Sequence, residues 1–147
     1  MKTPHLARIG YVSALQDYPS RAELDVLLSG WRRRNAQRGI TGLLLYDAGS
    51  VFQVIEGFPE DVVRLYESIV RDPRHHFLAR LSHQATCERS FGDWSMGQGR
   101  VTASDLAAAP ELAAFRDPGF RYWHCDELIA EALIEAFTTG PWRRSIV

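Results

Sequence analysis

The sequence predicts an α+β domain in which a five-stranded sheet carries two helices on one face and further helices on the other. Three observations predict it. Short runs of strand-forming residues recur between residues 6 and 99, two amphipathic segments with helical spacing separate them, and the third run is apolar on both faces. Side chains alternate across a strand, so a strand that is apolar on both faces needs cover on both.

The first strand and the first helix have clear sequence boundaries. Residues 6–13 (LARIGYVS) are rich in strand formers and end before the turn-prone QDYPS. Ser20 and Glu23 then form a capping box, and Gly39 is a typical helix stop, so we expect a helix over about residues 21–37. Its apolar stripe consists of Leu24, Leu27, Leu28 and Trp31.

A hairpin and a second helix follow. LLLY (43–46) and VFQVIE (51–56) are short apolar runs joined by the turn residues 47–50, which predicts strands two and three. Pro59 is a favoured first residue of a helix, and the Asp72–Pro73 pair ends it. The stripe of this second helix consists of Val62, Leu65, Tyr66 and Ile69.

The remaining segments complete the sheet and cover it. FLARLSH (77–83) and GDWSMGQG (92–99) are predicted as strands four and five, giving the order β-α-β-β-α-β-β. This order predicts a ferredoxin-like arrangement with one added strand, in a mixed sheet.

The C-terminal residues are predicted to cover the second sheet face. Residues 104–115 and 124–137 are expected to form a two-part helical cap around a turn at residues 117–119. In the second part, we expect the apolar residues to face the sheet and the glutamates to face away from it. The apolar set is Leu128, Ala132 and Phe137, and the glutamates are Glu127, Glu131 and Glu135.

Composition excludes several classes of partner. The 17 Lys and Arg residues and 18 Asp and Glu residues are interspersed, and the net charge is -1, so we expect neither nucleic acid nor a membrane as partner. Cys87 and Cys125 lie in no metal-binding or disulfide pattern. The chain shows no signal peptide and no run of about 20 apolar residues, which predicts a cytoplasmic protein.

Three neutral polar side chains are predicted to converge beneath the two helices. Gln53 lies in an apolar strand, where an unpaired amide would cost roughly 2–7 kcal/mol. Strand alternation allows Tyr11 to lie beside it, and Asn35 continues the inward stripe of the first helix. Each residue alone is explained by hydrogen bonds within the core, whereas the three together favour a bound polar ligand.

The predicted cleft suits a flat ligand. Its walls would be Leu27 and Ile69, with amides at one edge, and this combination fits a heteroaromatic ring with several donors and acceptors, such as a flavin. No G-x-G-x-x-G loop follows the first strand, so a dinucleotide would have to bind in another way than in a Rossmann fold.

Five ordered motifs carry a family resemblance. They are Y-V-S, R-N-x-x-x-G-I-T-G-L-L-L-Y, F-Q-V-I-E-G, D-P-R-H and F-x-D-W-S-M. With these motifs, the chain resembles the BLUF family of blue-light sensors that use FAD. The resemblance covers about residues 6–98, which implies a photosensor domain over residues 1–98 and a helical cap over residues 99–147.

The resemblance implies a flavin between the two helices, with FAD as the expected form and FMN or riboflavin as alternatives. Leu27 and Ile69 would sandwich the ring, and Asn35 would bond its polar edge. Further contacts to the polar edge and the ribityl chain would come from Asp72, Arg74 and His75, with a solvent-exposed loop as an equal alternative for Arg74 and His75. The chain departs from common family members at Arg34, where histidine or asparagine is frequent, and at Ser68, where some members carry an arginine.

The resemblance also implies a photochemical pair. Tyr11 would give an electron and a proton to the excited flavin, and Gln53 would rearrange by rotation or tautomerisation, leaving an oxidised flavin with a changed hydrogen bond and a small red shift. Trp94 and Met96 stand two apart in the predicted fifth strand, so we expect them to share a face and to exchange places near Gln53. Ordinary core filling is an equal alternative for these two residues.

We expect no enzyme activity and an output through a partner. Residues 99–147 are too short for a cyclase, phosphodiesterase or DNA-binding domain, so the predicted partners are a separate effector protein and further copies of this chain. The resemblance suggests a cyclic-di-nucleotide enzyme as effector. Two rival functions are an acylphosphatase-like hydrolase, whose arginine-bearing phosphate cradle residues 14–20 do not provide, and a light-insensitive regulatory domain that binds another planar ligand.

Overall fold

The computed structural model describes residues 3–109 and 121–147 and contains the predicted five-stranded mixed sheet. The strands are β1 (Leu6–Leu15), β2 (Thr41–Asp47), β3 (Ser50–Gly57), β4 (His75–Thr86) and β5 (Gly97–Gln98). The helices are α1 (Arg21–Arg38), α2 (Pro59–Arg71), α3 (Ala103–Ala107) and α4 (Glu127–Thr138), with short 3₁₀ helices at Tyr122–His124 and Pro141–Ser145.

The sheet order is β4-β1-β3-β2-β5. Every neighbouring pair is antiparallel except β2 and β5, which run parallel. The register of β1 against β3 pairs Tyr11 with Gln53 in the middle of the sheet. The two polar side chains that the sequence singles out are therefore direct cross-strand neighbours on two central strands.

Both main helices begin and end where their capping residues predict. The Ser20 side chain accepts a hydrogen bond from the backbone N–H of Glu23, and Glu23 completes the capping box at the start of α1. Gly39 ends this helix with a φ of 66°, in the left-handed region that glycine adopts without steric cost. Pro59 opens α2, and Asp72 follows its last turn.

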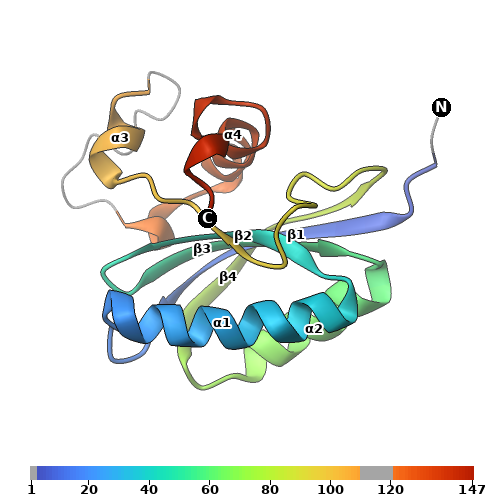
Figure 1. The fold of residues 1–147 in the computed structure, drawn as a ribbon, viewed down its shortest axis with the longest axis horizontal. Helices are drawn as coiled ribbons and strands as arrows, with labels where there is room; N and C mark the ends of the chain where they lie inside the picture. Colours follow the sequence, from blue (N-terminus) through green and yellow to red (C-terminus); the bar gives the residue numbers. More distant parts are fainter. Residues whose placement is uncertain (1–2, 110–120) are drawn as a thin grey trace.

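Helices α1 and α2 lie side by side on one face of the sheet (Figure 1). The core between helices and sheet is apolar. From the sheet it contains Ala7, Ile9, Leu15, Leu44, Val51 and Ile55, and from the helices Leu24, Leu28 and Val62, together with Ile40 and Met96. Val51 and Ile55 lie on the same face of β3 as Gln53, as strand alternation requires.

The opposite face of the sheet is covered by the C-terminal helices, as the two apolar faces of β3 predict (Figure 1). Phe52 and Val54 of β3 pack in one core with Leu133 and Phe137 of α4, and all four side chains are buried. The expected orientation of α4 is wrong at Leu128, which is 76% exposed. The buried residues of α4 are Ala130, Leu133, Ala136 and Phe137, and Leu128 lies on the opposite side because it precedes Phe137 by nine residues, or two and a half turns.

The predicted fifth strand is mostly irregular. Only Gly97–Gln98 pairs with β2, whereas residues 92–99 were expected to be a strand. The Trp94 carbonyl still accepts from the backbone N–H of Gly42 in β2, but the next two carbonyls bond to α1: Ser95 accepts from the Asn35 side chain and Met96 from the Arg32 side chain. These side-chain donors replace the ladder that a regular strand would need.

This irregular course separates Trp94 from Met96. Trp94 packs against the core under the C-terminal helices, whereas Met96 is buried in the core under α1 and α2. The expectation that the two residues share one face is therefore wrong, because side chains alternate by two only along a regular strand.

The C-terminal residues return to the sheet edge. Gly99 and Ile146 form an antiparallel bridge, and Gln98 and Val147 exchange backbone hydrogen bonds of 2.8 and 2.9 Å. The predicted turn at residues 117–119 and residues 110–115 of the first cap segment lie outside the described residues.

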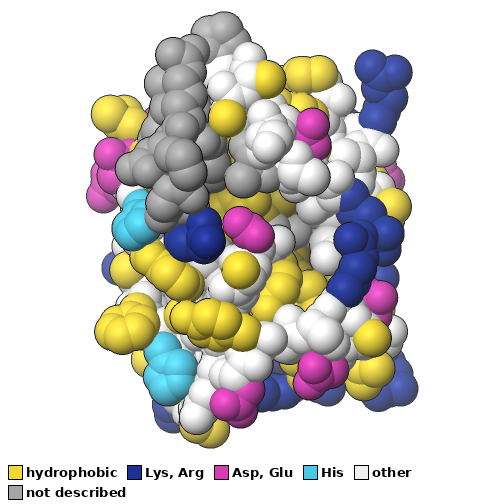
Figure 2. Space-filling model, turned by 90° about the vertical axis from the view of Figure 1, so that its left-hand side faces the viewer, with side chains coloured by type: hydrophobic (Ala, Val, Ile, Leu, Met, Phe, Trp, Pro, Cys, Tyr) yellow, Lys and Arg dark blue, Asp and Glu magenta, His cyan; other side chains and the backbone are white. Residues whose placement is uncertain are grey.

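The described residues contain no helix long and apolar enough to cross a membrane and no group of three or more metal-binding side chains. On the face shown in Figure 2, acidic and basic side chains are interspersed with hydrophobic ones.

Candidate functional site

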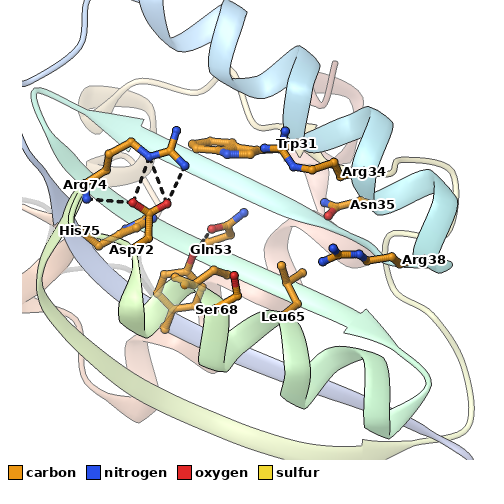
Figure 3. Close-up of a pocket in the computed structure, with 12 residues that line it drawn as sticks. Trp31, Arg34, Asn35, Arg38, Gln53, Leu65, Ser68, Asp72, Arg74 and His75 are labelled. Carbon is orange, nitrogen blue, oxygen red and sulfur yellow. Dashed lines mark hydrogen bonds and ion pairs between the residues drawn. The ribbon is translucent and has the colours of Figure 1, made fainter.

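A cavity of about 330 Å³ opens between α1 and α2 above the central strands (Figure 3). Its volume lies at the lower end of the range of small-molecule sites, roughly 300–1,000 Å³. The sheet contributes Tyr11, Gln53 and His75, and α1 contributes Trp31, Arg34, Asn35 and Arg38. From α2 and the residues after it come Leu65, Ser68, Ile69, Asp72 and Arg74.

Tyr11 and Gln53 form a hydrogen-bonded pair at the bottom of this cavity. The Tyr11 hydroxyl donates to Gln53 Oε1, and the two side chains are 0% and 6% exposed. Burial raises the pKa of Tyr11 well above its ordinary value, and the nearby Tyr66 and Asp72 add to this effect. The phenol is therefore protonated at neutral pH, and loss of an electron from it requires a path for its proton.

The other end of the Gln53 amide bonds to a weak acceptor. Nε2 donates to the sulfur of Met96 at 3.3 Å, and a thioether accepts hydrogen bonds only weakly. Rotation of the amide would point Nε2 at the Tyr11 oxygen and Oε1 at Met96, which has no hydrogen to donate. The amide therefore has two arrangements, and the one in the structure is held mainly by the Tyr11 hydroxyl.

Asn35 lies on α1 at the edge of the cavity and is 4% exposed. Its Nδ2 donates to the carbonyl of Ser95 at 2.8 Å. Among the described residues, Oδ1 has no hydrogen-bond donor, so this oxygen is available to a donor on a ligand.

Of the two predicted apolar walls of the cavity, only the one on α2 is confirmed. Ile69 of α2 lines the cavity as expected, with Leu65 one helical turn before it. On α1, Leu27 is half-buried and does not line the cavity, whereas Trp31, four residues later, does. The two residues share one helix face, and the longer indole side chain reaches across the opening (Figure 3).

The D-P-R-H segment forms the opposite end of the cavity. Arg74 holds Asp72 with Nη2 at 2.6 Å from Oδ2 and Nε at 3.0 Å from both carboxylate oxygens. This pairing lowers the pKa of Asp72. His75 Nδ1 lies 2.9 Å from Ser13 Oγ, and burial lowers the pKa of the imidazole. All three of the D-P-R-H residues that the sequence predicts to be in the site line the cavity.

Sequence reasoning missed part of the lining. Arg38 lines the cavity near Asn35, and the signal that could have found it is its spacing of three residues from Asn35. Arg34 and Ser68, the two departures from the common family pattern, both line the cavity as well. Trp94, which was expected beside Gln53, is absent from the lining because it packs under the C-terminal helices.

The residues present fit a flavin ring. Trp31, Leu65 and Ile69 provide apolar surface, and Gln53 and Asn35 provide amide groups between the two helices. A flavin supplies light absorption and redox chemistry when bound. The residues of this chain supply a buried phenol and, bonded to it, an amide that has both a donor and an acceptor end.

The sequence profile of one family, described as sensors of blue-light using FAD, matches residues 6–97. The chain belongs to the BLUF family. The match covers β1 to the start of β5 and includes every cavity residue, so the cavity is the part of the BLUF domain that lies between its two helices.

A named BLUF relative is the blue light- and temperature-regulated antirepressor BluF of Escherichia coli (strain K12). It is 33% identical over 91 residues, which are 62% of this chain and 23% of the relative. The chain therefore matches less than a quarter of the length of that protein.

Two solved BLUF-like structures match most of the chain. The ground state of BlsA superposes with a TM-score of 0.78 over 91% of this chain and 88% of the other, at 24% identity, which supports the fold alone. BlrB, a BLUF protein in its dark state, superposes with a TM-score of 0.65 over 88% of this chain and 98% of the other, at 29% identity. Both matches extend beyond residues 6–97 into the C-terminal helices.

Proposed function

We propose that this chain is a blue-light photoreceptor in which Tyr11 and Gln53 convert light absorbed by a bound FAD into a changed hydrogen bond. One observation carries the proposal: the buried Tyr11 hydroxyl donates to Gln53 Oε1 at the bottom of the cavity, while Gln53 Nε2 rests on the weak acceptor Met96. The Tyr11 phenol supplies the proton that follows the electron. The Gln53 amide relays this proton, and its donor and acceptor ends exchange places as it does so.

The roles of the other cavity residues follow from their positions. Ile69 and Trp31 hold the ring from the two helices, and Asn35 offers Oδ1 to a ring N–H. The Asp72–Arg74 pair and His75 contact the polar edge and the ribityl chain at the other end. Arg34 and Arg38 supply positive charge at the cavity, which supports a phosphorylated flavin such as FAD over riboflavin.

The output of the proposed receptor is a conformational change and no turnover of a substrate. The change at Gln53 passes through Met96 and β5 to the cap of residues 99–147, which presents it to a separate effector or to a second copy of the chain. The Escherichia coli relative, whose name describes a light-regulated antirepressor, supports an output through another protein. A cyclic-di-nucleotide enzyme and a cytoplasmic location remain predictions of the sequence analysis.

The experiment is absorption spectroscopy of purified protein under blue light. The wild-type protein is expected to carry a flavin whose absorption shifts reversibly to the red, and mass analysis of the released cofactor identifies it as FAD. Tyr11→Phe should keep the flavin and lose the shift, because the ring remains and the ionisable hydroxyl is gone.

Tyr66→Phe is the matched control. Its ring centroid lies 5.9 Å from that of Tyr11, but its hydroxyl does not bond to Gln53, so this variant should shift like wild type. A normal photocycle in Tyr11→Phe would disprove the role of Tyr11. Folded protein that stays colourless after addition of FAD would disprove the photoreceptor function altogether.

A further inference from the structure

Arg32 of α1 lies outside the cavity and yet bonds to the segment that Gln53 contacts. It is half-buried and precedes Asn35 by three residues, so the two side chains leave the helix on the same side. Arg32 Nε donates to the carbonyl of Met96 at 2.7 Å, and Asn35 Nδ2 donates to the carbonyl of Ser95 at 2.8 Å. Two successive carbonyls beside the cavity are thus held by α1.

The same guanidinium also holds the C-terminal strand. Arg32 Nη2 donates to the carbonyl oxygen of Val147 at 2.6 Å. That oxygen also accepts from the backbone N–H of Gln98 at 2.8 Å, within the pairing of residues 146–147 with the edge formed by β5 and Gly99. Arg32 therefore bridges the backbone next to Gln53 and the last residues of the chain with one rigid, planar group.

An unpaired acceptor lies at the same junction. Gln98 is 7% exposed, and its Oε1 is the buried side-chain atom that lacks a hydrogen-bond partner among the described residues. Gln98 is opposite Leu44, which belongs to the core beneath the helices, so its side chain lies on the same sheet face as Met96. Arg32 and the backbone N–H of Gln98 donate to the same Val147 oxygen, so the two residues meet at one acceptor.

We propose that Arg32 is a positioning residue that couples Met96 to the pairing of residues 146–147 with the sheet. The inference rests on the proposed function and names a route for its signal. When the Gln53 amide changes partners, Met96 loses the N–H that binds its sulfur, and its backbone carbonyl moves with it. Arg32 follows that carbonyl and weakens its bond to Val147, so the C-terminal strand loosens in the light.

The test compares hydrogen exchange of residues 140–147 in darkness and under blue light, together with the flavin spectrum of the same samples. In wild type, light should speed exchange in this peptide. Arg32→Ala should keep the red shift but exchange about tenfold faster in darkness, as expected for a lost charge-assisted hydrogen bond, with no further increase in the light.

Two further variants distinguish a specific role of Arg32 from a general effect of changing a charge on α1. Arg33→Ala removes an exposed neighbouring charge and should behave like wild type. Arg32→Lys keeps the charge, but one ammonium group does not span both carbonyls, so the light response of residues 140–147 should stay lost.

The outcomes distinguish the two proposals. A wild-type protein that binds flavin but shows no red shift would refute the proposed function. A normal red shift combined with an Arg32→Ala variant whose residues 140–147 still respond to light like wild type would refute the coupling role of Arg32 alone. An unchanged dark exchange rate in Arg32→Ala would refute it as well.

Discussion

Gln53 illustrates how a single polar residue defines the site. It lies in a strand whose other residues are buried, and both of its amide atoms have partners within the chain, Tyr11 and Met96. The bond from Nε2 to the Met96 sulfur adds little to stability, because a thioether is a weak acceptor. The weak bond to Met96 makes Gln53 suited to a rearrangement.

Several site residues could be predicted from sequence because they lie on regular elements. The periods of strand and helix place Tyr11, Gln53, Asn35 and Ile69 around one space. Arg38 could have been found from its spacing to Asn35, but Trp31 could not, because the reach of its side chain over the opening depends on the distance between α1 and α2, which periodicity does not contain.

His75 predicts a pH dependence of stability. Burial lowers the pKa of its imidazole, so the unfolded state binds the proton more readily than the folded state. The stability that depends on neutral His75 is present above the unfolded pKa of about 6.5 and is lost as the pH falls below it. The Asp72 carboxylate, whose pKa is lowered by Arg74, loses its contribution only in a more acidic range.

The measurement is the melting temperature between pH 7.5 and pH 5.5. Wild type should melt at a lower temperature at pH 5.5, and His75→Asn should show a smaller decrease, because an amide keeps a partner for Ser13 without titrating near pH 6. The exposed His5, which lies far from His75 in the sequence, provides the control, and His5→Asn should follow wild type. Equal decreases in His75→Asn and wild type would contradict this assignment.

At the scale of elements, the bounds of the main helices could be predicted from the sequence, whereas the course of the irregular segment before β5 could not. The start and end of α1 follow from Ser20, Glu23 and Gly39, which act on their own neighbours in sequence. The course of residues 92–96 could not be predicted, because the carbonyls of Ser95 and Met96 bond to Asn35 and Arg32 on a helix about 60 residues earlier. A local pattern does not contain such long-range partners.

A buried carboxylate fixes the loop that leads to this segment. Glu56 of β3 is 0% exposed, and its oxygens accept hydrogen bonds from the Thr41 hydroxyl, the Arg8 guanidinium and the backbone N–H groups of Ser90 and Phe91. The loop between β4 and β5 is therefore attached to the sheet at Ser90 and Phe91.

Glu56→Gln is expected to lower the free energy of unfolding by about 3 kcal/mol, because the new NH2 group faces donors and leaves Arg8 without its carboxylate. Urea denaturation measures the change. The control is Glu67→Gln on the exposed side of α2, which should stay within about 0.5 kcal/mol of wild type. A loss below about 1 kcal/mol for Glu56→Gln would show that this network is not an anchor.

At the scale of the whole molecule, the sheet separates the light-absorbing side from the cap. The cavity lies on the face of α1 and α2, and α4 covers the other face (Figure 1). Because Phe52 and Val54 are wholly buried under the cap, removal of residues 99–147 would expose them to water. Single substitutions are therefore a better test of the cap than truncation.

The orientation of α4 gives a matched pair of variants. Leu133→Ala should lower the free energy of unfolding by about 2–5 kcal/mol, because it removes a side chain that is 0% exposed. Leu128→Ala, on the same helix but 76% exposed, should change it by no more than about 0.5 kcal/mol. Thermal or urea denaturation measures both changes. A larger loss in Leu128→Ala than in Leu133→Ala would contradict the observed orientation of α4 and favour the one predicted from the sequence.

The central claim is that Gln53, and not simply any glutamine in the sheet, makes the flavin spectrum respond to light. The most direct measurement is the light-minus-dark absorption difference of Gln53→Leu beside Gln98→Leu, both with flavin bound. Each variant replaces a buried glutamine of the sheet with a side chain of similar size, but only Gln53 lines the cavity. We expect no red shift in Gln53→Leu and a normal red shift in Gln98→Leu, and a Gln53→Leu protein that shifts like wild type would contradict the claim.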